Sequence, residues 1–418
     1  MAERRTAVRG GRRAVSRGVA AALAGATLLG AAPGAWAAPS PRPAVSREEV
    51  RSGRTDLDRG LAALVERGGS VAALAELRED HRVTWRGAAG LADLATGERT
   101  RPDGRARIGS VTKTFVATVT LQLAAEGRIR LDGPVEEYLP GAVRNGRNIT
   151  VRQLLNHTSG LYDYWSAPEF ALGDEASVRR YLREGRWKTY TPRELLDVAA
   201  RHDPYFAPGR GWKYSNTNYV LVGMLIEKVS GRSWQQEVER RILRPLRLGG
   251  TVMPTTSPRI PGPHAKGYLP LPEGPADVSL LDPSVAGAAG GGISTTADLN
   301  RFLAALLGGR LLPKAQLAEM LEAVPAAELG ASYGLGIIRY DTACGPVWGH
   351  PGGIPGYSTF LLGTQDGRRQ FALSDTPYGD DATGGAVLEG LLNEALCGTG
   401  GGRAPVPASF TAPPRGLR

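Results

Sequence analysis

The sequence is poor in the side chains that bind metals or form thiol clusters. Its 418 residues include only two cysteines and five histidines, and these are scattered rather than grouped at the short spacings of a metal site. We therefore predict no metal ion and no cofactor. Because Cys344 and Cys397 are an even count, we expect them to form a disulfide if the chain reaches an oxidising compartment.

Basic runs with interleaved aromatic residues are also lacking after the first residues. Half of the formal net charge of +10 comes from residues 1–37, which hold six arginines and one glutamate. The remaining positive excess is modest, which argues against a nucleic-acid partner. Lysine is scarce beside arginine, so each lysine, Lys113 included, is more informative about function.

Only one long apolar run is present, from Val19 to Ala32. It follows the arginines and precedes Ala35-Trp36-Ala37, which fits a small-residue cleavage site. We predict a signal peptide over residues 1–37, cleaved after Ala37, and a secreted mature protein. A membrane anchor is the alternative, but the run is short for a span and no later stretch is long and apolar enough.

The mature chain begins with a helical pattern followed by strand-like patterns. After a proline-rich linker over residues 38–45, these segments are a helix at Ser46–Arg67 and strands at Val71–Leu77, Arg82–Ala89 and Arg105–Ile108. A further helix should follow and end near Gly127. This order indicates a helix laid against an antiparallel sheet.

Residues 131–282 change to helices and long loops. Thr150 begins one helix, and Thr191-Pro192-Arg193-Glu194 combines a cap, a first-turn proline and a glutamate three residues after the cap. Another helix, Asn218–Val229, ends before Gly231, and Ser233 caps the next. The region is predicted to be a mainly helical insertion.

Strand patterns return near the end of the chain. They lie at Tyr333–Tyr340, Pro346–Gly349, Tyr357–Gly363 and Arg369–Ser374, after a flexible turn at 290–296 and a helix at Ala297–Leu307, and before a helix at Ala386–Leu396. We therefore predict an α+β fold whose antiparallel sheet is built from both termini. Its sheet domain comprises residues 46–130 and 283–397, the helical domain 131–282, and residues 398–418 a disordered tail.

The stretch Ile108–Phe115 carries the first chemical signal. Ser110 and Lys113 stand three apart at the start of an amphipathic helix, so their side chains should share one face. A partly desolvated lysine can activate a serine as a nucleophile, and the free N–H groups of a helix start can stabilise an oxyanion. Taken alone, the pattern also fits a capping serine followed by a solvated lysine.

Two later motifs could serve the same site. Tyr214 and Asn216 lie on a loop before a helix, where a tyrosine can shuttle protons and an asparagine can hold a carbonyl group. His350-Pro351-Gly352-Gly353 follows a strand, and its glycines would let a substrate lie close to the strand edge. Their alternatives are a polar capping loop and an ordinary Pro-Gly turn.

Together, Ser-x-x-Lys at 110, Tyr-x-Asn at 214 and His-x-Gly at 350 resemble the exported serine D-alanyl-D-alanine carboxypeptidases and class C β-lactamases. The resemblance spans Ser46–Cys397 and includes Gly160-Leu161-Tyr162-Asp163-Tyr164, Tyr333-Gly334-Leu335-Gly336 and both cysteines. It implies the fold of the penicillin-recognising enzymes, an antiparallel sheet flanked by helices with a helical domain beside it.

The resemblance also implies residue roles. Ser110 would be the acylated nucleophile, Lys113 and Tyr214 the general base and proton relay, and Asn216 a contact to the substrate amide. His350 would supply a proton donor near Tyr214. The N–H groups of Ser110 and Gly353 would form the oxyanion hole, with Gly352 also in the substrate site.

The third motif departs from that of carboxypeptidases. Pro351 and Gly353 carry no side-chain hydroxyl, and Ile338 stands where we would place an arginine for the terminal carboxylate. Arg339 beside it should point to the other face, because strand side chains alternate. A carboxylate without a partner would bind poorly.

The leading prediction is an exported serine hydrolase that acts on D-alanyl peptides of the peptidoglycan type. The first alternative is an esterase, D-amino-acid amidase or β-lactamase on the same machinery. The second is a non-catalytic module that only binds muropeptides or β-lactams. We expect a small peptide, ester or β-lactam as substrate, no nucleic-acid partner, no membrane span after signal removal, and a monomer.

Overall fold

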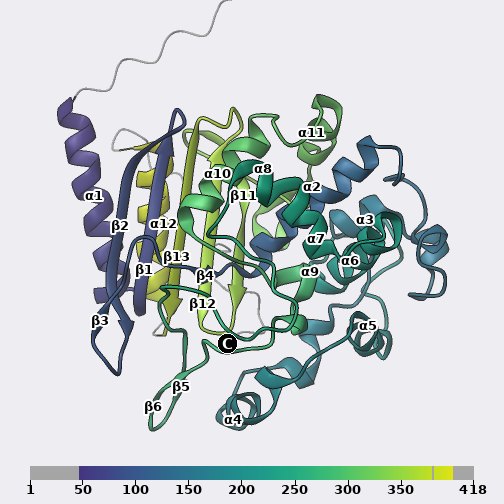
Figure 1. The fold of residues 1–418 in the computed structure, drawn as a ribbon, viewed down its shortest axis with the longest axis horizontal. Coiled ribbons are helices and arrows are strands. Elements are labelled where there is room, and N and C mark those ends of the chain that lie inside the picture. Colours follow the sequence, from purple (N-terminus) through teal and green to yellow (C-terminus); the bar gives the residue numbers. More distant parts are fainter. Residues whose placement is uncertain (1–46, 379–380, 399–418) are drawn as a thin grey trace, which may run out of the picture. The chain divides into compact units, whose positions relative to one another are not determined.

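The computed structural model describes residues 47–378 and 381–398 (Figure 1). The predicted signal peptide over residues 1–37, the linker over 38–45 and nearly all of the tail over 398–418 lie outside these residues. Within them, no helix combines the length and apolar character that a membrane span requires.

An antiparallel sheet of nine strands lies at the centre of the described chain, in the order β3-β2-β1-β13-β12-β11-β10-β9-β8. Strand β1 pairs directly with β13, so the first strands join the last, as predicted for a sheet built from both termini. The strands are β1 Ser70–Glu79, β2 Arg82–Asp93, β3 Glu98–Arg99, β8 Val324–Ala326, β9 Ala331–Tyr333, β10 Ile338–Thr342, β11 Gly345–Ile354, β12 Tyr357–Thr364 and β13 Arg369–Pro377.

Three of the described helices begin at the predicted caps. Thr150, Thr191 and Ser233 each form a capping box, and Gly231 ends α6 with a φ of 71°. The α-helices of the described residues are α1 Arg47–Glu66, α2 Thr112–Ala125, α3 Val151–Leu155, α4 Glu175–Arg183, α5 Pro192–Ala200, α6 Asn216–Ser230, α7 Trp234–Val238, α8 Arg244–Leu246, α9 Gly287–Gly290, α10 Thr296–Leu307, α11 Lys314–Leu321 and α12 Asp381–Cys397.

Helices cover both faces of the sheet. Helices α1 and α12 share a buried core with Phe371 and Leu373 of β13. On the opposite face, α2 and α10 share a core with Ala372, the residue between them. This alternation follows from the two-residue period of a strand. Figure 1 shows α2, α3, α5, α6 and α7 gathered beside the sheet, on the side away from α1.

Two segments differ from expectation within or next to the predicted helical region. A small hairpin, β5 Tyr268–Leu271 with β6 Gly274–Asp277, lies inside residues 131–282. The predicted flexible turn at 290–296 instead contains the end of α9 and strand β7 Ile293–Ser294, which pairs with β4 Ala106–Arg107. The assignment of residues 131–282 to a separate domain stays a prediction.

The strand predicted over Tyr333–Tyr340 is wrong, because two strands stand there. Strand β9 ends at Tyr333 and β10 begins at Ile338. Between them Gly336 has a φ of 76°, and a Cβ on it would lie 2.4 Å from that of Ala117 on α2. Only glycine fits this close approach, so the break lets the sheet pack directly on the helix that follows Ser110.

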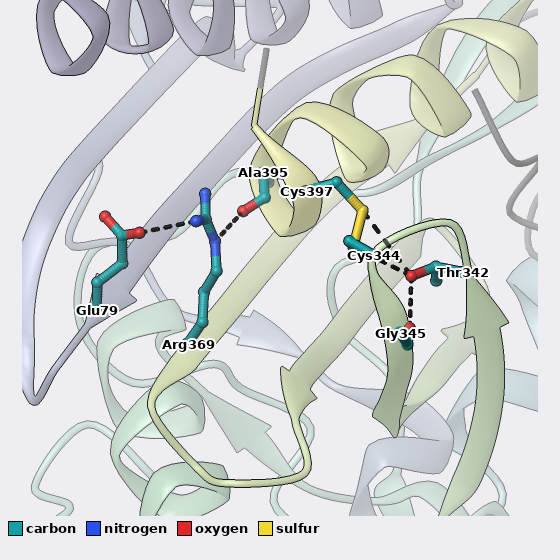
Figure 2. The surroundings of a disulfide bond; sticks show 7 residues. All are labelled: Glu79, Thr342, Cys344, Gly345, Arg369, Ala395 and Cys397. Carbon is teal, nitrogen blue, oxygen red and sulfur yellow. Dashed lines mark hydrogen bonds and ion pairs between the residues drawn. A yellow bond between two sulfur atoms is a disulfide. The ribbon is translucent and has the colours of Figure 1, made fainter. Parts of the chain in front are cut away.

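A disulfide closes the C-terminal part of the fold. Cys344 lies in the turn between β10 and β11 and is joined to Cys397 at the end of α12, as predicted from their even count (Figure 2). Nearby, Arg369 Nε donates to the Ala395 carbonyl at 2.7 Å, and Arg369 pairs with Glu79 at 2.8 Å. The bridge therefore fixes α12 to the sheet beside an ion pair that reaches β1.

Candidate active site

Ser110 lies in a tight turn that packs against the sheet. The turn is the 3-10 segment η1, Gly109–Val111, and α2 follows it directly. Gly109 has a φ of 47°, and a Cβ on it would lie 2.7 Å from the backbone nitrogen of Gly353 on β11. Glycine is required at 109 because the turn meets the strand backbone to backbone. Ser110 therefore stands at a helix start, where N–H groups lack intrahelical partners.

Lys113 is fully buried and points back toward the serine. Its Nζ lies 3.0 Å from Ser110 Oγ, 2.7 Å from Asn216 Oδ1 and 2.6 Å from the carbonyl oxygen of Ala289. The amide and carbonyl oxygens can only accept, so they take both hydrogens of a neutral amine and leave its lone pair toward the serine hydroxyl. Ser110 and Lys113 thus lie on one face of the helix start and contact each other, as their spacing predicts.

The environment of Lys113 favours the uncharged amine more than water does. Burial lowers the pKa of Lys113 to about 7, and the Asp163 carboxylate opposes this shift. The rings of Tyr214 and Tyr219, with centroids 4.8 and 5.4 Å from Nζ, also favour the charged form. Near neutral pH the lysine is therefore present in both forms, as a proton acceptor must be.

Tyr214 belongs to the same cluster, but no hydrogen bond holds its hydroxyl group. That hydroxyl is buried and unpartnered in the structure. Burial raises the pKa of Tyr214, and the interaction with the neighbouring Ser110 hydroxyl opposes this shift. The raised pKa favours the neutral phenol, which can pass a proton on but is a weak base.

Asp163 also belongs to the cluster, although the sequence analysis assigned it no role. Its Oδ1 accepts the backbone N–H of Asn216 at 2.9 Å, and its Oδ2 accepts Asn216 Nδ2 at 3.2 Å. These contacts turn the amide oxygen of Asn216 toward Lys113. Burial raises the pKa of Asp163, while the N–H groups of Asn216 and Trp165 oppose the shift. The segment Gly160–Tyr164 was part of the family resemblance, but one loop aspartate gave no chemical signal.

His350 lies near Tyr214 but does not bond to its hydroxyl group. Its Nε2 lies 2.8 Å from the Tyr333 hydroxyl and its Nδ1 is 2.5 Å from the Pro351 carbonyl. The ring centroids of His350 and Tyr214 are 6.2 Å apart. Burial lowers the pKa of His350 to about 3, so the ring is neutral. Its predicted role as a proton donor stays a prediction, and its contacts lead to Tyr333 instead.

The glycines of the third motif serve the packing of the serine turn. A Cβ on Gly352 would lie 2.0 Å from the Ile108 carbonyl oxygen, so the turn fills the space that was expected for a substrate. Gly353 N lies beside Gly109, next to Ser110. This arrangement brings together the two backbone segments predicted to form an oxyanion hole. Substrate contacts of Gly352 and Gly353 stay predictions.

The predicted direction of Arg339 is wrong. Arg339 pairs with Trp348 in the β10–β11 register, whereas Ile338 pairs with Gly349 and packs in the core with α1 and α12. Opposite residues of antiparallel strands share a face, and Trp348 shares its face with His350, so Arg339 lies on the site side. There its Nε and Nη2 bind Asp341 at 3.0 and 2.8 Å.

A cavity of about 310 Å³ adjoins the cluster, although Ser110 does not line it. Three of its lining residues stand next to the site: Ile354 follows Gly353, Trp165 follows Asp163 by two positions, and the Val285 carbonyl accepts the Tyr164 hydroxyl at 2.6 Å. The lining also includes the aromatic and aliphatic residues Phe170, Leu172, Tyr181, Tyr190 and Leu281 and the charged residues Glu169, Arg180, Glu184 and Lys188. The cavity therefore has an apolar part that suits an apolar group and charged residues elsewhere in its lining.

The described residues offer a serine with an adjacent amine rather than a metal centre. Among them, no group of three or more histidine, cysteine, aspartate or glutamate side chains could hold a metal ion. A partly exposed serine, an amine of lowered pKa and a neutral tyrosine are the parts required for acyl transfer through a covalent intermediate.

Comparison with protein families gives a match over most of the chain. The family described as Beta-lactamase matches residues 57–386. Penicillin-binding protein 4* of Bacillus subtilis is 29% identical over 304 residues, which cover 67% of this chain but only 62% of that protein. The chain thus spans less than two thirds of that relative's length.

Solved structures match over nearly their whole length. A D-stereospecific amidohydrolase from Streptomyces sp. is 44% identical, with a TM-score of 0.74 over 83% of this chain and 99% of its own. The D-amino acid amidase from Ochrobactrum anthropi SV3, complexed with L-phenylalanine amide, is 29% identical, with a TM-score of 0.70 over 82% and 98%. These matches confirm the predicted fold class and the predicted family.

Proposed function

Because the chain belongs to the beta-lactamase family and is a serine hydrolase of that fold, we propose that it hydrolyses amides and short peptides of D-amino acids through an acyl-enzyme at Ser110. The observation that carries the reaction type is the contact between Lys113 Nζ and Ser110 Oγ at 3.0 Å. The substrate class is supported by the 44% identity to the D-stereospecific amidohydrolase.

In the proposed reaction, the neutral amine of Lys113 takes the proton of Ser110 while Oγ attacks the amide carbon. The N–H groups of Ser110 and Gly353 stabilise the oxyanion that forms on the carbonyl oxygen. Tyr214 passes a proton to the leaving nitrogen and is resupplied by Lys113, so ammonia or an amine departs. Water then attacks the ester at Ser110 while Lys113 accepts the proton of the water, and a proton returns to Ser110 Oγ, which releases the D-amino acid and restores the serine.

The surroundings of the site argue against a terminal carboxylate as the main recognition feature. Arg339 is on the site side of β10, but Asp341 already binds its guanidinium group. Pro351 and Gly353 offer no hydroxyl group on β11. A substrate that ends in a neutral amide avoids the cost of burying an unpaired carboxylate. This supports an amidase in preference to the D-alanyl-D-alanine carboxypeptidase that was the leading prediction.

The apolar cavity supports substrates with a large side chain. It is bounded by Trp165, Phe170 and Tyr190 and adjoins Ile354 at the end of β11. We propose that it receives the side chain of the residue whose carbonyl carbon is attacked. Its volume of about 310 Å³ is ample for one aromatic ring.

The test is turnover of D-phenylalanine amide, L-phenylalanine amide and a peptide ending in D-Ala-D-Ala by the wild-type protein and by Ser110→Ala. We expect kcat/KM for the D-amide to exceed that for each of the others by at least about tenfold. Ser110→Ala should be inactive with a circular dichroism spectrum like that of the wild type. Equal turnover of both enantiomers, or unchanged activity in Ser110→Ala, would contradict the proposal.

Carboxypeptidase activity is the second candidate, and the similarity to penicillin-binding protein 4* favours it. If the D-Ala-D-Ala peptide is the better substrate in the same assay, this candidate replaces the amidase. Preferential cleavage of short acyl esters would instead support the esterase alternative, and stoichiometric binding without product would support the binding module.

A further inference from the structure

Two sequence motifs that have no role in the proposed chemistry meet behind the active site. His157 belongs to the segment His157–Leu161 after α3, and Tyr333 belongs to the segment Tyr333–Gly336 between β9 and β10. Both side chains are fully buried. The Tyr333 hydroxyl lies 3.1 Å from His157 Nε2 and 2.8 Å from His350 Nε2, so it joins the two histidines.

The position of each proton in this series of hydrogen bonds follows from the partners of the two histidines at its ends. The backbone N–H of Ser215 donates to His157 Nδ1 at 3.2 Å, so Nδ1 is an acceptor and the hydrogen of His157 is on Nε2. Asn218 Nδ2 also lies 3.1 Å from Nδ1, and Ser159 Oγ donates to Asn218 Oδ1 at 2.6 Å, which fixes the direction of that amide. His157 Nε2 therefore donates to the Tyr333 oxygen.

The other end gives a consistent assignment. The Pro351 carbonyl can only accept, so the hydrogen of a neutral His350 is on Nδ1 and its Nε2 must accept from Tyr333. The neighbouring Tyr219 hydroxyl donates to the Leu155 carbonyl at 2.9 Å, so it supplies no competing donor. The chain of hydrogen bonds thus runs in one direction, from the loop before α6 to the strand that carries Gly353.

Tyr214 depends on these three rings for its position. Its hydroxyl group has no hydrogen bond, yet its ring centroid lies 4.3 Å from that of His157, 6.3 Å from that of Tyr333 and 6.2 Å from that of His350. Lys113 Nζ also lies 4.8 Å from the centroid of the Tyr214 ring. An active-site hydroxyl that is not held directly must be placed by the packing of its ring.

We propose that His157 and Tyr333 are positioning residues that, through the directed hydrogen bonds to His350, fix the ring of Tyr214 against Ser110 and Lys113. The three residues form one hydrogen-bonded unit between the helical segment and β11. This unit also keeps two uncharged histidines beside Lys113, so the lysine remains the one titrating cation of the cluster among the described residues. The inference rests on the proposed role of Tyr214 as a proton relay but not on the identity of the acyl donor.

The first test observes the proton positions in the wild-type protein by nitrogen-15 NMR of labelled histidine. Only five histidines are present, and His157→Gln and His350→Gln identify the two signals. We expect His157 protonated on Nε2 and His350 on Nδ1 between pH 6 and about 8. The reverse tautomer of either ring, or a charged His350, would overturn the proposal.

The second test removes the central hydroxyl while keeping its ring. In Tyr333→Phe we expect kcat for p-nitrophenyl acetate to fall about tenfold to a hundredfold while KM changes less than about threefold. This ester reports on Ser110 and Tyr214 whatever the natural substrate is. If it is hydrolysed normally by the wild type while D-amides are not, the proposed substrate fails and this inference stands.

Tyr268→Phe is the matched control for that test. The Tyr268 hydroxyl is also buried, accepts from Leu94 N at 3.0 Å and faces Asp93 at 3.5 Å, but it lies on the β5–β6 hairpin. We expect its kcat to stay within about twofold of the wild type. Equal kcat in Tyr333→Phe and Tyr268→Phe would overturn the proposal, because general loss of a buried hydroxyl would then explain any effect.

Discussion

At the scale of single residues, the site is built around one buried amine, that of Lys113, and the groups that hydrogen-bond to it. The neutral amine of Lys113 donates to two acceptors, Asn216 Oδ1 and the Ala289 carbonyl, so the position at which it can accept a proton faces Ser110. Tyr214 differs from Lys113, because its buried hydroxyl group has no hydrogen-bond partner. The contrast favours Lys113 as the base that first activates the serine.

The pH dependence of acylation should follow Lys113. Its pKa is lowered by burial to about 7, so below that pH the amine is protonated and cannot accept the serine proton. We therefore expect kcat/KM to rise about tenfold per pH unit below about pH 7 and to level off above it. A pH profile measured between pH 5 and about 9 with p-nitrophenyl acetate tests this, and a flat profile would contradict the assignment.

Asp163 should matter through Asn216 rather than by touching substrate. In Asp163→Asn one oxygen becomes an NH₂ group, which cannot accept from the Asn216 backbone or side chain. We expect kcat to fall about tenfold or more, because the amide that orients Lys113 is released. Asp298→Asn is the control, since Asp298 is also buried and accepts the N–H of Gly250 at 2.8 Å in α10. Similar losses of kcat in both variants would refute the argument.

At the scale of elements, the contact between the serine turn and β11 is the feature that assembles the site. The turn and the strand touch through Gly109 and Gly352, whose missing side chains leave room for backbone atoms. The same close approach places the backbone nitrogen of Gly353 beside Gly109 and that of Ser110 beside Gly352. Two glycines on separate segments therefore determine whether the predicted oxyanion hole can exist.

Adding one carbon atom at this contact should damage both stability and activity. In Gly352→Ala the new Cβ would lie 2.0 Å from the Ile108 carbonyl oxygen, so the turn must move away from the strand. We expect a loss of about 1–3 kcal/mol in the free energy of unfolding and a large fall in kcat. Gly249→Ala, where no atom lies within 4 Å of the new Cβ, should behave like the wild type in denaturant titrations and assays. Normal kcat in Gly352→Ala would disprove this role.

The sequence predicted these elements unevenly, for physical reasons. Helix starts at Thr150, Thr191 and Ser233 were predictable because capping is a local interaction. The break at Gly336 was not, because its cause is the distant Ala117 on α2. The direction of Arg339 was also mispredicted, since register fixes which face a strand residue occupies, and register depends on the partner strand.

The site shows the same division between local and distant information. Ser110 and Lys113 could be placed together from their spacing, because residues three positions apart at the start of a helix lie on the same face. The anchoring of Asn216 by Asp163 and the chain through His157, Tyr333 and His350 join segments far apart in the sequence. No local pattern reports such contacts, although the family resemblance included the segments that hold Asp163, Asn216, Tyr333 and His350.

At the scale of the whole molecule, one covalent link joins the C-terminal helix to the central sheet. The disulfide joins Cys344 and Cys397 over a sequence separation of 53, and the loop that it closes includes β11, β12 and β13. The chain-entropy relation gives about 4 kcal/mol for a loop of this length. The link lies on the α12 side of the fold, and Figure 2 shows it beside Arg369 and Glu79. It should therefore support the sheet rather than the chemistry.

Loss of this link should lower stability while leaving catalysis intact at low temperature. In the double variant with Cys344→Ser and Cys397→Ser, we expect Tm to fall by about 5–10 °C, because unfolding then releases more chain entropy. Differential scanning calorimetry and activity at 25 °C measure the two effects. An unchanged Tm, or a loss of kcat in folded protein, would show that the bridge acts otherwise.

The central claim is that Ser110 carries the acyl group of a D-amino acid during turnover. The most direct measurement is intact-protein mass spectrometry after rapid acid quenching of a reaction with D-phenylalanine methyl ester, followed by peptide mapping. We predict a D-phenylalanyl adduct on the peptide that contains Ser110, formed faster than with the L-ester and missing from Ser110→Ala. An adduct on another residue, or turnover of the ester by Ser110→Ala at the wild-type rate, would contradict the account.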